Sequence, residues 1–263
     1  MKILFYPRGT APGSKVWFYT NFLKIPRTKD IDEDGISHIY HNDYANENKV
    51  SLEILNLGLP IINKTCTNIK KDYIDQIFEK VFGYSTMVNP RTHKGYCVQK
   101  STQNAIHNGK IVKCPMNPDL AIHKSKSGEN HSVIYQKLID TRIGKDLLHD
   151  IRVPVFKGKV PCVFIKQLGM QNTFHPYKEH PYNVYMDAAH NHLTQSELNN
   201  IESFCLFLGL DYGELDILRN NSDGLIYIVD VNDKPHGVLF NKLGEDKDKA
   251  VELLSNYFKK YCL

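Results

Sequence analysis

A stretch near the C-terminal end of the chain constrains the fold more than any other. It reads DYGELDILRNNSDGLIYIVDVN and runs from Asp211 to Asn232. Two β-prone runs, 213–220 and 225–232, flank a dense cluster of turn-forming residues, and this pattern predicts a β-hairpin. A turn in the middle of the cluster would place Asp216 directly opposite Asp230 on the neighbouring strand.

The predicted hairpin brings together groups that suit a metal ion. Side chains alternate between the two faces of a strand, so Asp230 and Asn232 share a face. Two carboxylates opposite each other repel and destabilise a strand pair, whereas a divalent cation between them would stabilise it. Two carboxylates and an amide oxygen suit Mg²⁺ or Mn²⁺ better than zinc. The alternative is a solvent-exposed hairpin rim that carries two unrelated acids.

Composition excludes several classes of protein. With 263 residues, 41% hydrophobic and 24% charged, the chain resembles an ordinary globular protein of one large or two small domains. Its net charge is +4, and its basic residues are scattered rather than clustered into a patch that would bind nucleic acid. The six cysteines contain no Cys-x-x-Cys pair, so they indicate neither a zinc cluster nor a disulfide framework. Without a signal-peptide-like or membrane-spanning apolar run, we expect a cytoplasmic protein that binds neither membrane nor nucleic acid.

The first third of the chain alternates between strand-like and helix-like segments. This alternation predicts a small parallel sheet with helical connections. The expected strands are 1–6, 36–41 and 60–63, and the expected helices are 14–23 and 50–57. A longer amphipathic helix follows over 68–82, with Gly83 as its stop. It carries Lys70 and Lys71 in its first turn, and solvated surface lysines are the commoner interpretation of such residues taken alone.

The middle of the chain predicts further strands. Residues 95–100 and 109–114 form one expected hairpin around a polar loop, with Lys100 at the lip of that loop. A strand over 131–139 follows. Residues 148–156 and 160–168 form a second expected hairpin, in which Arg152 faces away from its apolar neighbours; a basic exposed sheet face is the alternative.

The last hundred residues contain one long segment without periodicity and two helices. Residues 169–193 are rich in Pro, His and Asn, and we expect a loop that serves substrate specificity. Zinc binding by its histidines is disfavoured, because no cysteine or carboxylate spacing accompanies them. Helices are expected over 194–208, where Thr194 and Glu197 form a capping box, and over 245–261.

The hairpin at 211–232 also carries a family resemblance. GELDILR, a turn and then IYIVDVN resemble the metal-binding end of ATP-grasp enzymes. The resemblance is to the broad group that contains D-alanine–D-alanine ligases and the ligases that add glutamate to ribosomal protein, and it covers about 60–237. It implies an α+β fold in which two α+β lobes clasp ATP, preceded by a short α/β N-terminal lobe. The implied divisions are 1–64 for the N-terminal lobe, 65–135 for the first ATP-grasp lobe with the phosphate loop, and 136–263 for the second lobe with the metal site.

The resemblance also implies roles for individual residues. Asp216, Asp230 and Asn232 would hold Mg²⁺ or Mn²⁺ against the ATP phosphates, and Arg152 and Lys166 would supply catalytic positive charge. Lys71 would reach the nucleotide, and Lys100 would contact its phosphates. The backbone of the hinge strand would recognise adenine and Asp140 at its end would take the ribose; the hinge residues are Gln136, Lys137, Leu138 and Ile139. Two departures weaken the match. Many relatives have Glu where this chain has Gln136 or Lys137, and the turn after the metal Asn keeps only Pro235 and Gly237 of the usual pattern.

The implied activity is ATP-dependent ligation of a carboxylate to an amine through an acyl phosphate. Such sites work by positioning and charge neutralisation, so no covalent nucleophile is expected. The expected partners are small-molecule carboxylate and amine substrates, and a homodimer is left open. Two other classes stay open as well: an ATP-grasp phosphotransferase, and a nucleotide-binding module with little turnover.

Overall fold

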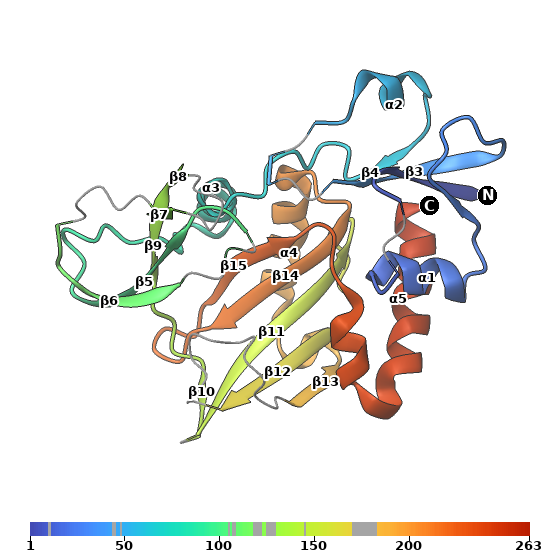
Figure 1. The fold of residues 1–263 in the computed structure, drawn as a ribbon. Helices are drawn as coiled ribbons and strands as arrows, with labels where there is room; N and C mark the ends of the chain where they lie inside the picture. The colour runs from blue at the N-terminus through green and yellow to red at the C-terminus, as the bar shows by residue number, and fades with distance from the viewer. Residues whose placement is uncertain are drawn as a thin grey trace.

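The computed structural model describes residues 1–9, 12–43, 46–47, 49–104, 106, 109–117, 123–124, 130–144, 146–169 and 183–263. Within these ranges the strands form one four-stranded, one six-stranded, one three-stranded and one two-stranded sheet. The six-stranded sheet occupies the middle of the molecule, with the N-terminal sheet on one side and the three-stranded sheet on the other (Figure 1). None of the described helices is long and apolar enough to cross a membrane.

The N-terminal residues form the predicted parallel sheet, with strand order β2-β1-β3-β4. Both of its helices begin after a serine that accepts a backbone hydrogen bond: Ser14 from Trp17 and Ser51 from Ile54. These caps satisfy backbone N–H groups that a helix start leaves without a partner. The elements are β1 Lys2–Pro7, α1 Lys15–Phe22, β2 Arg27–Thr28, β3 Ile36–Asn42, α2 Leu52–Asn56 and β4 Ile61–Ile62.

The three-stranded sheet has the order β6-β5-β9 and contains the first predicted hairpin. The strand predicted over 131–139 is interrupted: its start belongs to the two-stranded sheet, and β9 ends at Lys137. Helix α3 precedes this sheet in the chain and ends, as predicted, at Gly83, whose φ of 80° lies in the left-handed region. The elements are α3 Lys71–Phe82, β5 Gly95–Ser101, β6 Lys110–Cys114, β7 His123–Lys124, β8 Asn130–His131 and β9 Val133–Lys137.

The central sheet has the order β13-β12-β11-β14-β15, with the short β10 beside β11, and all of its neighbours are antiparallel. It contains the second predicted hairpin, β11–β12, and the hairpin β14–β15 from which the prediction started. Its strands are β10 Arg142–Ile143, β11 Leu147–Phe156, β12 Val163–Gly169, β13 Asn183–Asp187, β14 Tyr212–Arg219 and β15 Ile226–Asn232.

The prediction of a continuous loop over 169–193 is wrong in its second half. Residues 183–187 form β13, which pairs with β12 from Val163↔Asp187 to Gln167↔Asn183. The 3-10 helix η2 Ala189–Asn191 follows. Strand β13 has weak alternation of its own and forms because the edge of β12 offers free backbone partners. Residues 170–182, which include His175 and His180, lie outside the described residues.

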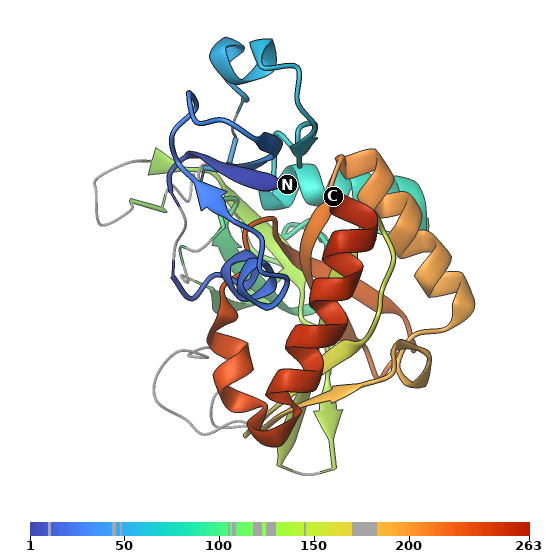
Figure 2. The same ribbon diagram turned by 90° about the vertical axis from the view of Figure 1, so that its right-hand side faces the viewer.

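The two faces of the central sheet pack against different helices. One face supplies Ile151, Val153 and Leu215 to a core that also includes α3 and α4. Helix α4, Gln195–Leu208, has the predicted capping box at its N-terminus. At the end of the sheet nearest the N-terminal strands, a second core includes α1 and the C-terminal helix α5, Lys247–Cys262. Helices α1 and α5 lie side by side, and both chain ends lie close together (Figures 1 and 2).

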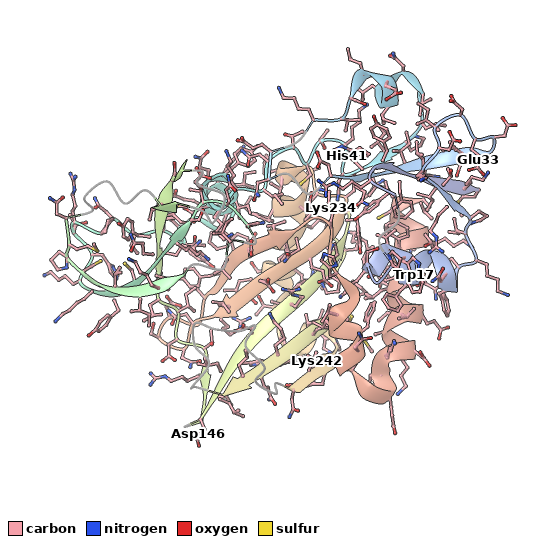
Figure 3. All side chains as sticks on the ribbon, viewed as in Figure 1. Trp17, Glu33, His41, Asp146, Lys234 and Lys242 are labelled. Atoms are coloured by element: carbon pink, nitrogen blue, oxygen red, sulfur yellow. The ribbon has the colours of Figure 1, made fainter. Side chains whose placement is uncertain are left out.

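The second core joins the N-terminal sheet to the hairpin β14–β15. Phe5 of β1 and Tyr40 of β3 belong to it together with Tyr212 at the start of β14. Beyond the end of β15, Lys234 is buried and pairs with Asp233. His41 of β3 lies nearby (Figure 3), where burial and the charge of Lys234 lower its pKa. The short 3-10 helices η3 Gly237–Lys242 and η4 Gly244–Asp246 then lead into α5.

Candidate active site

The hairpin β14–β15 has the predicted register. Asp216 pairs with Asp230, and Glu214 pairs with Asn232. At the turn, the N–H of Asn220 donates to the carbonyl of Leu225 at 2.9 Å. Next to the turn Arg219 pairs with Ile226, and a register shift between Asp216 and Ile217 then brings Asp216 opposite Asp230.

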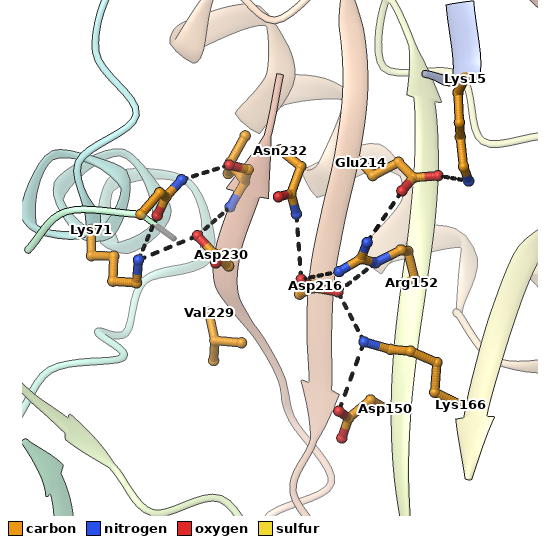
Figure 4. Close-up of polar contacts among 12 residues, drawn as sticks. Lys15, Lys71, Asp150, Arg152, Lys166, Glu214, Asp216, Val229, Asp230 and Asn232 are labelled. Carbon is orange, nitrogen blue, oxygen red and sulfur yellow. Dashed lines mark hydrogen bonds and ion pairs between the residues drawn. The ribbon is translucent and has the colours of Figure 1, made fainter. Parts of the chain in front are cut away.

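Asp216 lies among positive charges from its own sheet. Arg152 of β11 donates from Nε and Nη2 to its two carboxylate oxygens at 2.8 and 2.6 Å (Figure 4). Lys166 of β12 lies 3.3 Å away, and the Asn232 amide donates at 3.4 Å. Burial raises the pKa of Asp216, but Arg152 and Lys166 outweigh burial and hold that pKa well below its usual range.

Asp230 faces a lysine from another part of the chain. The Nζ of Lys71, at the first position of α3, lies 3.5 Å from Oδ1 of Asp230 (Figure 4). Lys71 is buried and donates to the carbonyl of Gln103 and the side chain of Asn104. Asn104 in turn donates to the carbonyl of Val231 at 2.8 Å. The interpretation of Lys71 as a solvated surface lysine is therefore wrong.

Lys100, near the end of β5, reaches the same hairpin. Its Nζ lies 3.5 Å from the carbonyl oxygen of Val229. Burial first, and then the charge of Lys71, lower the pKa of Lys100 to about 8. The structure thus brings Lys71 and Lys100, the two lysines predicted to contact the nucleotide, to the Asp230 side of the hairpin.

The side chains of the predicted hinge are engaged within the protein. Gln136 is buried and donates to Thr86 at 3.1 Å. Lys137 donates to Asp223 at 2.5 Å and to the hydroxyl of Tyr227 at 2.7 Å, which ties the hinge to the hairpin turn.

The end of the hinge lies at the edge of the first core. Ile139 is partly buried there, and Leu138 is 36% exposed. Asp140 accepts from Nε and Nη2 of Arg142 at 2.7 and 2.6 Å and from its backbone N–H at 3.1 Å. A nucleotide at this strand would therefore meet backbone groups and Leu138 more readily than the polar side chains.

Sequence reasoning missed two charged residues of this site. Glu214 shares the face of Asp216 on β14, and Lys15 of α1 donates to it (Figure 4). The alternation of side chains along β14 could have indicated Glu214. Lys15 lies 199 residues away in the chain, and no local pattern pairs it with Glu214.

The turn after Asn232 packs against the N-terminal part of the chain. The N–H of Lys15 donates to the carbonyl of Pro235, and the N–H of Gly237 donates to the carbonyl of Gly13 at 2.7 Å. A Cβ on Gly237 would lie 2.5 Å from the ring of Phe18, so this approach requires glycine. The two retained residues of the turn therefore contact α1 and the loop before it.

Comparison with solved structures finds proteins of the same fold. One is the ATP-grasp ligase PsnB, in a complex with a phosphomimetic variant of its minimal precursor, Mg and ADP. Its TM-score is 0.64 at 12% sequence identity, covering 97% of this chain and 98% of that chain. A second is the D-alanine–D-alanine ligase of Bacillus anthracis, with a TM-score of 0.57 at 15% identity and coverage of 99% and 94%. A third is the D-cycloserine synthetase DcsG, with a TM-score of 0.52 at 12% identity and coverage of 97% and 98%.

The likeness is one of fold rather than of sequence. No protein-family model and no curated protein sequence matches the chain. The similar structures nevertheless cover nearly the whole of it, and they confirm the architecture that the hairpin resemblance predicts.

Proposed function

We propose that this chain, which has the ATP-grasp fold, is an ATP- and Mg²⁺-dependent ligase that joins a carboxylate to an amine. The observation that carries the proposal is the gathering of basic side chains from separate elements around one pair of acids. These basic residues are Lys71 of α3, Lys100 of β5, Arg152 of β11 and Lys166 of β12. Fixed positive charge beside paired carboxylates suits a metal–triphosphate complex.

The donor groups at the hairpin fit a hard divalent cation. Asp216, Asp230 and Asn232 offer carboxylate and amide oxygens on one face of the strand pair. Groups of three or more His, Cys, Asp or Glu side chains that could hold a metal are absent from the described ranges. Mg²⁺ is commonly held by one or two carboxylates together with substrate phosphates, which is the arrangement proposed here. When bound, the cation would neutralise the negative charge of the ATP phosphates. The Mg and ADP in the PsnB complex support this assignment.

Two of the basic residues would bind ATP, and the other two would bind the substrate carboxylate. Lys71 and Lys100 lie on the Asp230 side and would bind phosphate oxygens. Arg152 and Lys166 lie on the Asp216 side and would hold the carboxylate that attacks the γ-phosphorus. The backbone of 136–140 would bind the adenine.

The proposed reaction has two steps. A carboxylate oxygen of the substrate forms a bond to the γ-phosphorus, and the bond to the β-phosphate oxygen breaks, which yields an acyl phosphate and ADP. The amine nitrogen then attacks the carbonyl carbon, phosphate leaves, and the amine proton passes to solvent. All six cysteines are buried, consistent with chemistry that needs no thiol nucleophile.

The proposal is tested by a screen of carboxylates and amines, both small molecules and peptides, that detects ADP and phosphate and identifies products by mass spectrometry. An amide product together with free phosphate supports ligation. A stable phosphorylated product would instead identify a phosphotransferase, and nucleotide binding without either product would identify a binding module. The D-alanine and D-cycloserine ligases that share the fold make amino acids a reasonable first set.

A further inference from the structure

Glu214 and Lys15 form an ion pair inside the protein next to the candidate metal site. The side chain of Glu214 is 1% exposed and that of Lys15 is 0% exposed. The Nζ of Lys15 donates to Oε1 of Glu214 and lies 4.6 Å from the ring centres of Phe164 and Phe240. Removing two charges from water is costly, so a buried pair of this kind calls for an explanation beyond stability.

The second oxygen of Glu214 is left unsatisfied. Oε2 is buried and accepts no hydrogen bond from any described residue. The Nη1 of Arg152 lies 3.5 Å from it (Figure 4). Arg152 instead directs Nε and Nη2 to Asp216, at 2.8 and 2.6 Å. The guanidinium therefore lies between two carboxylates and is hydrogen-bonded to only one of them.

This arrangement places Arg152 in competition with a metal ion. The guanidinium of Arg152 donates one hydrogen bond to each carboxylate oxygen of Asp216. Lys166 at 3.3 Å and the Asn232 amide at 3.4 Å take the remaining lone-pair positions of this carboxylate, so a divalent cation at Asp216 must displace at least one of these donors. If Arg152 is the donor that moves, a second carboxylate within reach offsets the hydrogen bond lost in this partly buried place and so favours metal binding.

We propose that Glu214, held by Lys15, is a positioning residue that accepts Arg152 when Asp216 binds the metal. This inference rests on the proposed function, because it takes Asp216 as a metal ligand. A small shift of the guanidinium converts the 3.5 Å contact with Oε2 into a hydrogen bond. The hydrogen bond from Lys15 holds the carboxylate of Glu214 in place for this role. Arg152 then stays beside the hairpin, where the substrate carboxylate is expected.

A purely structural role for the pair predicts something different. If Lys15 and Glu214 only tie α1 to the central sheet, their removal lowers stability and leaves metal affinity unchanged in the folded protein. If Glu214 receives Arg152, its removal lowers metal affinity only while Arg152 is present. The coupling between the two residues separates these explanations.

The experiment measures Mn²⁺ binding in the presence of ADP by electron paramagnetic resonance, with a protein-free ADP titration as the blank. The double variant Lys15→Met with Glu214→Gln removes both charges, so the net charge near the site is unchanged. We expect it to weaken Mn²⁺ binding about tenfold, or about 1.4 kcal/mol. In a protein that also carries Arg152→Met, the same pair of substitutions should change the affinity less than about twofold.

Two further variants keep the test decisive. Glu214→Asp replaces the double variant in the test if the latter does not fold. It retains a carboxylate for Lys15 but moves that carboxylate away from Arg152, so it should also weaken Mn²⁺ binding. Equal effects with and without Arg152, or no effect, would overturn the role of Glu214. Asp216→Ala tests the proposed function separately: if Mn²⁺ binding survives that change, the metal site itself is wrong, and this inference fails with it.

Discussion

Asp216 and Asp230 face each other across one strand pair, yet their surroundings come from different parts of the chain. The partners of Asp216 are Arg152 and Lys166, which belong to strands of the same sheet. Asp230 faces Lys71 of α3 at 3.5 Å, and 27% of its side chain is exposed against 18% for Asp216.

The Asp216 side, which one sheet holds together, is the rigid half of the site, and the Asp230 side, which a helix start and nearby contacts hold, is the adjustable half. Strands β11, β12 and β14 share backbone hydrogen bonds, so the charges around Asp216 are held before any ligand arrives. The lysine opposite Asp230 depends on a helix start and on contacts with Gln103 and Asn104. We expect the strands of the Asp216 half to stay in place when nucleotide and metal bind, with only the guanidinium of Arg152 shifting, and the contacts of Lys71 in the Asp230 half to rearrange.

The largest effect should come from removing the acid of the adjustable half. Asp230→Ala should lower Mg²⁺-dependent ATP turnover at least about 100-fold, because a catalytic metal supplies several kcal/mol of charge stabilisation. The measurement is ADP release, and circular dichroism should show an unchanged fold. Full activity in this variant would show that Asp230 is not a metal ligand.

The two acids should differ in their contribution to stability. Asp216→Asn removes the carboxylate that lies nearest to both Arg152 and Lys166 and should lower the free energy of unfolding by about 2 kcal/mol. Asp230→Asn, at a more open position, should cost less than about 1 kcal/mol. Urea unfolding of both variants checks this order. Equal costs would remove the distinction between a rigid and an adjustable half.

Neighbouring lysines at the start of α3 give a matched pair of variants. Lys71→Met should weaken ADP binding about tenfold, since it removes a buried cation beside Asp230. Lys70→Met should leave binding unchanged, because Lys70 is partly exposed and pairs with Glu47 at 2.7 Å. Isothermal titration calorimetry measures both. An equal loss in the two variants would point to general charge rather than to a specific contact.

The smallest expected effect is a pH dependence of nucleotide binding. Burial and Lys71 lower the pKa of Lys100 to about 8, so its ammonium is charged below that pH and loses its charge above it. ADP affinity should therefore fall about fivefold between pH 7 and pH 9, because most Lys100 side chains are charged at pH 7 and few are charged at pH 9. Lys100→Arg should flatten the profile, because a guanidinium stays charged throughout this range. An unchanged slope in Lys100→Arg would assign the dependence to another group.

The sequence predicts those parts of the site that depend on local patterns. The hairpin β14–β15 follows from a turn cluster and from alternation along two strands, whereas the pairing of Asp216 with Asp230 also depends on a register shift between Asp216 and Ile217. The hairpin β5–β6 with Lys100 and the orientation of Arg152 follow in the same way. Each of these features depends on about twenty consecutive residues, so spacing and strand geometry are enough to predict it.

The parts that were missed depend on distant partners. Lys71 is buried because residues 103–104 close over it, and nothing near Lys71 indicates this. Strand β13 forms on the edge of β12, although its own residues alternate weakly. Lys15 finds its carboxylate only when the N-terminal helix packs against the central sheet. Tertiary contact, rather than local preference, decides all three.

Asn63, just after β4, bears on how the chain can be divided. Its buried side chain bonds the carbonyls of Tyr212 and Asp233 and the N–H of Tyr212, at 2.8, 3.1 and 2.9 Å. Its own N–H donates to Asp211 at 2.8 Å. A fragment that starts at residue 65 would lose these hydrogen bonds at the base of the hairpin and would expose Tyr212, which packs with Phe5 and Tyr40 of the N-terminal sheet. Truncated or recombined versions of the protein should therefore keep the N-terminal sheet and the hairpin together.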